Sequence, residues 1–129
     1  EEQISIPEVK SPDDRLMERV MRVINENLSN PALTVEMIST EVGISRVHLH
    51  RKLKGLTNQT TQQLIRNLRL KQAATLLADK RHSITEVATL TGFTHPTYFA
   101  TAFREMYGIS PSEYMERHIG QDKTKDGIF

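Results

Sequence analysis

The chain has 129 residues, of which 37% are hydrophobic, and it contains no cysteine. This length and composition predict one domain with a modest core of small packed helices, and they argue against a deep enzyme cleft. The lack of cysteine excludes disulfides, thiol catalysis and thiolate metal sites. No apolar run approaches the roughly 20 residues that span a membrane, and no secretory signal pattern is present, so we expect no membrane contact.

The formal net charge of +1 conceals an uneven distribution of charge. Residues 43–81 contain nine Lys or Arg and one acid, so 9 − 1 = +8, whereas residues 1–14 contain five acids and one Lys, so 1 − 5 = −4. A charge run is usually a solvated face. Here the basic residues lie on and beside a predicted pair of short helices, which favours a surface that faces phosphates.

The chain opens with an acidic stretch, residues 1–11, that has little periodicity and is expected to be a linker from an upstream domain. Because the chain begins with Glu and not Met, we also expect it to be part of a longer protein. Ser11 and Pro12 suit the cap and first position of a helix. Residues at helical spacing then predict one buried face, formed by Leu16, Val20, Val23, Ile24 and Leu28.

Two short helices and one long helix follow. Thr34 caps the first short helix, Gly43 provides a turn, and Ser45 caps the second, which is predicted from Arg46 to about Lys54 and broken by Gly55-Leu56-Thr57. The long helix is predicted from about Thr60 to Ala78. Since its apolar residues lie on more than one side, we expect it to contact units on both flanks.

The second half of the chain repeats this order of elements. Residues 83–86 form a capping box for a short helix, and Gly92 then requires a left-handed turn. A further helix begins around His95-Pro96 and ends at Gly108, and a seventh begins at Ser110. No strand pattern persists, so the predicted fold is all-α with about seven helices. Residues 120–129 are polar, without periodicity, and are expected to form a disordered tail.

An internal repeat relates the two halves. The offset is 49 residues before the turn, where Val35, Ile38, Val42 and Gly43 match Ile84, Val87, Thr91 and Gly92. It is 50 residues after the turn, where Leu49, Leu53, Leu56 and Leu64 match Phe99, Phe103, Met106 and Tyr114. Each unit reads as a helix-turn-helix. A connecting helix of about 19 residues is roughly 28 Å long, which allows a separation near the 34 Å of one DNA turn between the two reading helices.

The amino-acid sequences of both units are specific enough to indicate a family. The stretch from Gly92 to Tyr114, GFTHPTYFATAFREMYGISPSEY, resembles the signature of the AraC/XylS family of bacterial transcription regulators. The first unit, VGISRVHLHRKLKGLTNQT followed by RNLRLKQAATLL, is similar to the same family's usual pattern. The resemblance covers about residues 14–119. It implies that residues 12–119 form a double helix-turn-helix domain that binds double-stranded DNA, with RNA polymerase as a partner and a cytoplasmic location.

The resemblance also implies residue roles and an upstream domain. The segment RKLKGLT resembles the output domains of hybrid two-component regulators, so a receiver or another sensor domain is expected before the linker. Arg51 is favoured as a base contact because its guanidinium fork matches guanine, and a phosphate contact is the alternative. The implied base-reading residues are Val47, His50, Arg51, His95, Pro96, Thr97, Ala100 and Thr101. The implied phosphate contacts are Arg46, Lys54 and Arg104.

Other functions find less support in the sequence. His48 and His50 lie two residues apart on a helix and point in different directions, which argues against a metal site. No carboxylate pair, nucleophile and base, or Gly-rich phosphate loop indicates an enzyme, and no cofactor is expected. The remaining alternative is a helical protein-interaction module whose basic face meets an acidic partner. Such a module would bind DNA weakly and without sequence preference.

Overall fold

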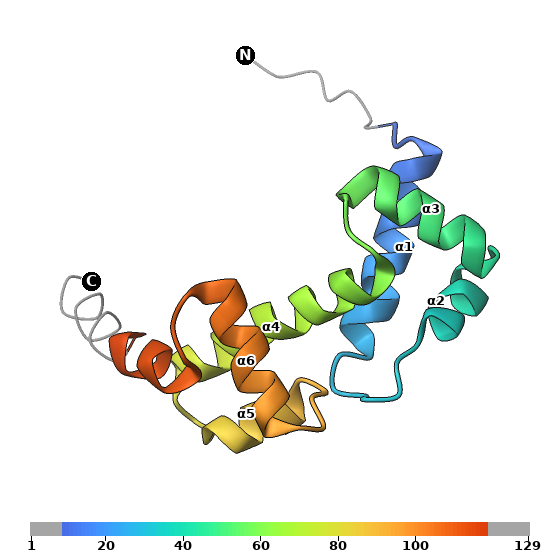
Figure 1. The fold of residues 1–129 in the computed structure, drawn as a ribbon. Helices are drawn as coiled ribbons and strands as arrows, with labels where there is room; N and C mark the ends of the chain where they lie inside the picture. Colours follow the sequence, from blue (N-terminus) through green and yellow to red (C-terminus); the bar gives the residue numbers. More distant parts are fainter. Residues whose placement is uncertain (1–8, 119–129) are drawn as a thin grey trace, which may run out of the picture.

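The computed structural model describes residues 9–118, which form seven helices and no strands, as expected. The acidic segment before residue 9 and the tail of residues 120–129 lie outside the described residues. Figure 1 shows the order of the helices along the chain. Their bounds are Pro12–Glu26 (α1), Val35–Val42 (α2), Arg46–Thr57 (α3), Thr61–Asp79 (α4), Ile84–Leu90 (α5) and Pro96–Tyr107 (α6), and residues 111–118 form the seventh.

Side-chain caps explain where most helices begin. Ser11, Thr34, Ser45, Thr60 and Ser83 each have an extended backbone and accept a hydrogen bond from an amide at the start of the following helix. Such caps satisfy amides that the helix itself leaves free, and each contributes about 1 kcal/mol. Three of them, at α1, α4 and α5, are complete capping boxes. The predicted starts are therefore confirmed.

The predicted end of α3 was wrong. The helix continues through Gly55 to Thr57, and Asn58 ends it in the left-handed conformation with φ 59°. A glycine inside a helix costs about 1 kcal/mol, which does not stop a helix whose opposite face is buried. The Thr57 hydroxyl donates to the Leu53 carbonyl at 2.7 Å and accepts from the Gln59 amide at 3.1 Å, so hydrogen bonds fix the end three residues later than predicted.

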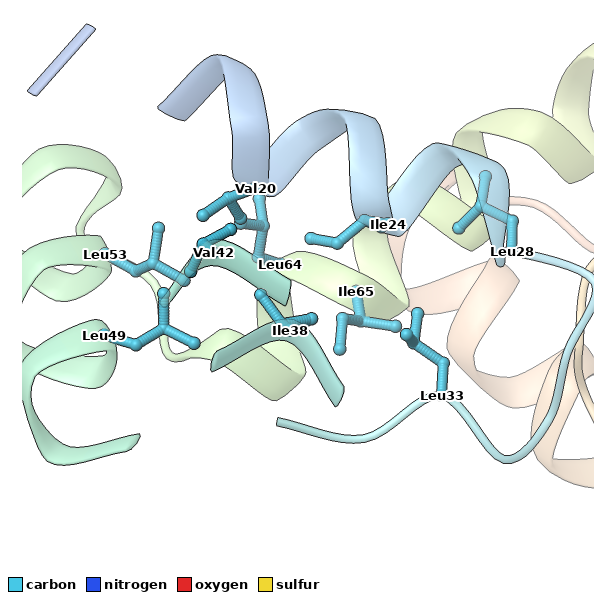
Figure 2. Packing of buried hydrophobic residues seen from close by; sticks show 10 residues of the cluster. All are labelled: Val20, Ile24, Leu28, Leu33, Ile38, Val42, Leu49, Leu53, Leu64 and Ile65. Carbon is cyan, nitrogen blue, oxygen red and sulfur yellow. The ribbon is translucent and has the colours of Figure 1, made fainter. Parts of the chain in front are cut away.

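Two separate hydrophobic cores lie along α4, as its two-sided pattern predicted. The first, shown in Figure 2, joins α1, α2 and α3 to Leu64 and Ile65 at the beginning of α4. The second joins α5 and α6 to Leu70 and later residues of α4, with Phe99 and Phe103 almost fully buried. The chain thus forms two units on one shared helix. None of the helices in the described part of the chain is long and apolar enough to cross a membrane.

The internal repeat is present in three dimensions. α3 and α6 each have 12 residues, and their first residues differ by 96 − 46 = 50. Before the turn, Gly43 and Gly92 differ by 49 and have φ values of 78° and 91°. One matched pair of the sequence repeat does not consist of core residues. Leu56 and Met106 are 43% and 37% exposed and do not belong to the cores. The paired elements therefore present equivalent faces.

Candidate nucleic-acid interface

α3 is anchored by one face and exposes the other. Leu49 and Leu53 are fully buried in the first core. Residues one or two positions from Leu49 or Leu53 are rotated away from this buried face, whereas residues one turn apart share a face, so Val47, His50, Arg51 and Lys54 point outward. The exposed face consists of Arg46, Val47, His50, Arg51 and Lys54. The structure thus brings together all five residues that the sequence proposed for the first reading helix.

α6 repeats this arrangement in the same register. Phe99 and Phe103 are buried, and their rings lie 5.8 Å apart between centroids. The exposed side is formed by Pro96, Thr97, Ala100, Thr101 and Arg104, each 50 residues after its counterpart on α3. His95 precedes the helix at the cap position, is exposed and makes no side-chain cap hydrogen bond. The two faces match in position but differ in chemistry, because the second offers shorter side chains and a single cation.

Equivalent backbone hydrogen bonds set the turns of the two helix pairs. The Ile44 amide donates to the Ser39 carbonyl at 3.2 Å, and 49 residues later the Phe93 amide donates to the Ala88 carbonyl at 2.9 Å. The second turn then has one more residue before its reading helix begins. Both turns use a glycine at positive φ, as we predicted for Gly92. The reading helices are therefore held by the same local geometry.

Ion pairs modify the basic surface that the sequence suggested. Arg46 Nη1 lies 2.8 Å from Glu36 Oε2 on α2, although both side chains are 65% exposed. Lys52 lies 2.8 Å from Asp13 on α1, and the Arg69 guanidinium is directed at the Asn30 carbonyl, so neither belongs to the reading face. Within residues 9–118, no ion pair engages Arg51, Lys54 or Arg104. These three cations are available to an anionic partner.

The beginning of α4 also borders the reading face, which sequence reasoning missed. An open depression of about 390 Å³ is lined by Val47 and His50 together with Thr60, Thr61 and Gln62. The short connection after α3 brings this helix start back beside the reading helix. The only sequence signal was the capping box at Thr60 and Gln63, which predicts a helix start but not its neighbours. Gln62 is exposed there and is a further candidate for a polar contact.

The described residues offer no evident metal site. No group of three or more His, Cys, Asp or Glu side chains within residues 9–118 is placed to hold a metal ion. Tyr98 is half exposed, and its ring lies 6.0 Å from that of Phe93. The exposed polar side chains of the two equivalent faces are suited to an extended surface and not to a closed pocket.

These features define a double helix-turn-helix DNA-binding domain. A helix-turn-helix domain family matches residues 38–117, which is more than half of the chain. The chain belongs to the AraC family of transcription regulators and is a sequence-specific DNA-binding domain of such a regulator. The AraC/XylS resemblance and the leading functional hypothesis are confirmed. The function therefore differs from that of the protein-interaction module considered as the alternative.

Three similar proteins illustrate the relationship. Histidine kinase P4 of Formosa agariphila is 33% identical over 88% of this chain, which spans 8% of that protein. The C-terminal domain of AraT, a response regulator from Geobacillus stearothermophilus, is 29% identical with a TM-score of 0.75, covering 83% of this chain and 88% of that one. The DNA-binding domain of AdpA, a global transcriptional factor in complex with a target DNA, is 29% identical with a TM-score of 0.74, covering 82% and 94%.

Proposed function

We propose that the domain places α3 and α6 in successive major grooves on one side of a single DNA site. The observation that carries this proposal is the matched register of two exposed helix faces, 50 residues apart, on one continuous molecule. α4 has 19 residues and would set the distance between them. Two such helices normally come from two subunits and read two half-sites about one helical turn apart. Here one chain would suffice, and the site need not be palindromic.

We assign the contacts by the position of each side chain on these faces. The outward residues nearest the start and centre of each helix would read base edges, because the beginning of a reading helix enters the groove most deeply. The cations at the helix ends would meet phosphates, which fix the register on the duplex. The proposed base-reading residues are Val47, His50, Arg51, His95, Pro96, Thr97, Ala100 and Thr101. The proposed phosphate contacts are Arg46, Lys54 and Arg104.

We propose that residues 12–119 act as the output domain of a longer two-component regulator. The similarity to a histidine kinase and to a response regulator supports an upstream receiver or sensor domain. The chain spans less than two thirds of the first curated relatives that it matches. We further propose that the domain works in the cytoplasm, where it meets both DNA and RNA polymerase. We assign no catalytic step to this domain, because residues 38–117 match a helix-turn-helix domain family.

Selection from a random duplex library, followed by gel shifts, tests the proposal. The selected duplex and a scrambled duplex of the same composition are compared at two salt concentrations, with random competitor DNA present. We expect the selected duplex to bind at least about 1,000-fold more tightly than the scrambled one. Equal affinity for both duplexes would contradict sequence-specific reading and would favour a purely electrostatic basic surface.

A further inference from the structure

Besides sharing α4, the two units come close to one another where Gly92 lies against the Leu28 carbonyl. Among the described residues, the extensive helix contacts lie within a unit or involve α4, and each unit has its own hydrophobic core. Figure 1 shows the loop after α1 approaching the loop between α5 and α6, beside the middle of α4. A single helix can bend gently, so a second contact between the units would limit how far they can reorient.

Arg69 on α4 forms the polar part of this contact. Its Nη2 donates a hydrogen bond to the Asn30 carbonyl at 2.8 Å, across 39 residues of sequence. The same carbonyl accepts from the Leu33 amide at 3.1 Å, and Asn30 Oδ1 accepts from the Ala32 amide at 2.9 Å. Arg69 therefore binds a loop that is already fixed by its own hydrogen bonds. Burial lowers the pKa of Arg69 and the nearby Tyr98 acts in the opposite direction, yet a guanidinium stays charged in proteins.

Gly92 forms the close-packed part of the contact. A Cβ added to Gly92 would lie 2.3 Å from the Leu28 carbonyl oxygen and 2.8 Å from Arg69 Nε. Gly43, the equivalent glycine of the first unit, has no atom within 4 Å of the same position. The difference cannot come from the turn, because both glycines have positive φ. Gly92 thus allows the second unit to approach the first more closely than any other residue would.

We propose that Arg69 is a positioning residue that locks the two helix-turn-helix units at one relative orientation and so sets the half-site spacing that the domain accepts. This inference rests on the proposed binding to two successive grooves. Inserting one base pair moves a half-site by about 3.4 Å and rotates it by about 34°. A rigid pair of units cannot follow such a change without losing contacts, whereas loosely connected units can. The contact made by Arg69 would therefore make the domain selective for one spacing between the two half-sites.

A DNA-free experiment tests the lock itself. The chain has no cysteine, so Thr40→Cys on α2 and Thr89→Cys on α5 would place spin labels at two exposed sites, one in each unit. Double electron–electron resonance spectroscopy would then give the distribution of distances between the two labels, and so between the units. Arg69→Met keeps the aliphatic stem but removes the donors, and we expect a clearly broader distribution. Arg69→Lys restores one donor and should give a distance distribution of intermediate width. If the Arg69→Met variant unfolds, the comparison is made with Arg69→Lys instead.

Arg19→Met is the matched control. Arg19 donates to the Val42 carbonyl at 2.7 Å, an equivalent bond from an arginine to a carbonyl, but entirely within the first unit. Both variants lose one such bond, so both should melt at a lower temperature. Only the Arg69 variant should broaden the distance distribution. An unchanged distribution in Arg69→Met and Arg69→Lys would overturn the proposal, as would equal broadening in Arg19→Met.

A DNA experiment then tests the consequence. The probes are the selected duplex, the same duplex with one base pair inserted or removed between its half-sites, and one with a scrambled second half-site. Arg69→Met should lose about tenfold on the selected duplex and less on the altered spacings, because flexible coupling lowers the effective concentration of the second unit. Its affinity for the duplex with one intact half-site should be unchanged. Undiminished spacing selectivity in Arg69→Met would overturn the proposal, whereas failure of the unaltered domain to prefer the selected duplex would instead contradict DNA reading.

Discussion

Arg51 and Thr101 occupy the same position on the outer faces of the two reading helices, 101 − 51 = 50 residues apart, and both are exposed. The Thr101 hydroxyl donates to the Thr97 carbonyl at 3.1 Å, so this side chain is folded back on its own helix. Arg51 has no ion-pair partner among residues 9–118. A long forked donor thus faces the partner in one unit, and a short, internally bonded hydroxyl in the other.

Arg51→Ala should relax discrimination at one base pair. A bidentate arginine to a guanine contributes about 1–3 kcal/mol of discrimination, and alanine cannot replace it. The measurement is the affinity of the variant for the selected duplex and for random DNA. Thr101→Ala provides the comparison and should cost less. An equal loss on specific and random DNA would show that Arg51 contacts only phosphate.

Lys54→Ala should weaken binding to all sequences about equally. Its ammonium lies at the end of α3, 3.5 Å from the Asn58 carbonyl, and no acidic side chain among the described residues pairs with it. Loss of one phosphate contact should reduce the magnitude of the slope of log affinity against log salt by about one unit. Titrations over a range of salt measure this slope. A changed base preference at constant slope would exclude the phosphate role.

Glu36→Gln should strengthen binding modestly. Glu36 holds the Arg46 guanidinium at 2.8 Å, so a partner phosphate must compete with this carboxylate. Since exposed ion pairs contribute only about 0.2–1 kcal/mol, we expect an increase in affinity of about two- to fivefold at low salt. Glu18→Gln removes another exposed ion pair, with Lys10, away from the reading helices, and should have no effect. Equal gains for both variants would indicate a change in overall charge and not the release of Arg46.

Gly92→Ala should destabilise the domain far more than Gly43→Ala. Both substitutions place a side chain at positive φ, which costs about 1 kcal/mol. Only at Gly92 would the new Cβ collide with a backbone oxygen, that of Leu28. Overpacking of this kind adds about 1–3 kcal/mol, and Gly92→Val should be worse still. Urea unfolding of the variants gives the free energies, and equal losses at the two glycines would disprove the close contact between units.

Local sequence signals predicted the elements well because local chemistry decides them. Five helices begin at a capping residue whose hydrogen bond spans only three residues, so the start can be predicted from local sequence. These capping residues are Ser11, Thr34, Ser45, Thr60 and Ser83. The end of α3 was mispredicted because Gly55 was treated as a break, while the decisive left-handed residue was Asn58. Both outward faces followed from the inward residues, since a helix fixes one from the other.

Contacts between distant segments were not visible in the sequence. Arg69 was counted with the basic residues expected to face phosphates, yet it donates to Asn30 across the boundary of the two units. Arg46 and Lys52 were likewise counted among the basic residues of segment 43–81, although each pairs with an acid on another helix. Such partners depend on how helices pack, and no local pattern records them. Gly92 was predicted for its turn, but its approach to Leu28 emerged only from the fold.

A scan of every single-base substitution across the selected duplex tests the central claim most directly. If α3 and α6 read successive grooves, the sensitive positions should form two clusters about 10 base pairs apart. The cluster under α3 should show the sharper losses, near 1–3 kcal/mol at its best position, because the side chains of α6 offer mainly short hydrogen bonds and contacts with thymine methyl groups. A single cluster, or no position-dependent loss, would contradict reading by two helices, and larger losses under α6 would contradict the assigned asymmetry.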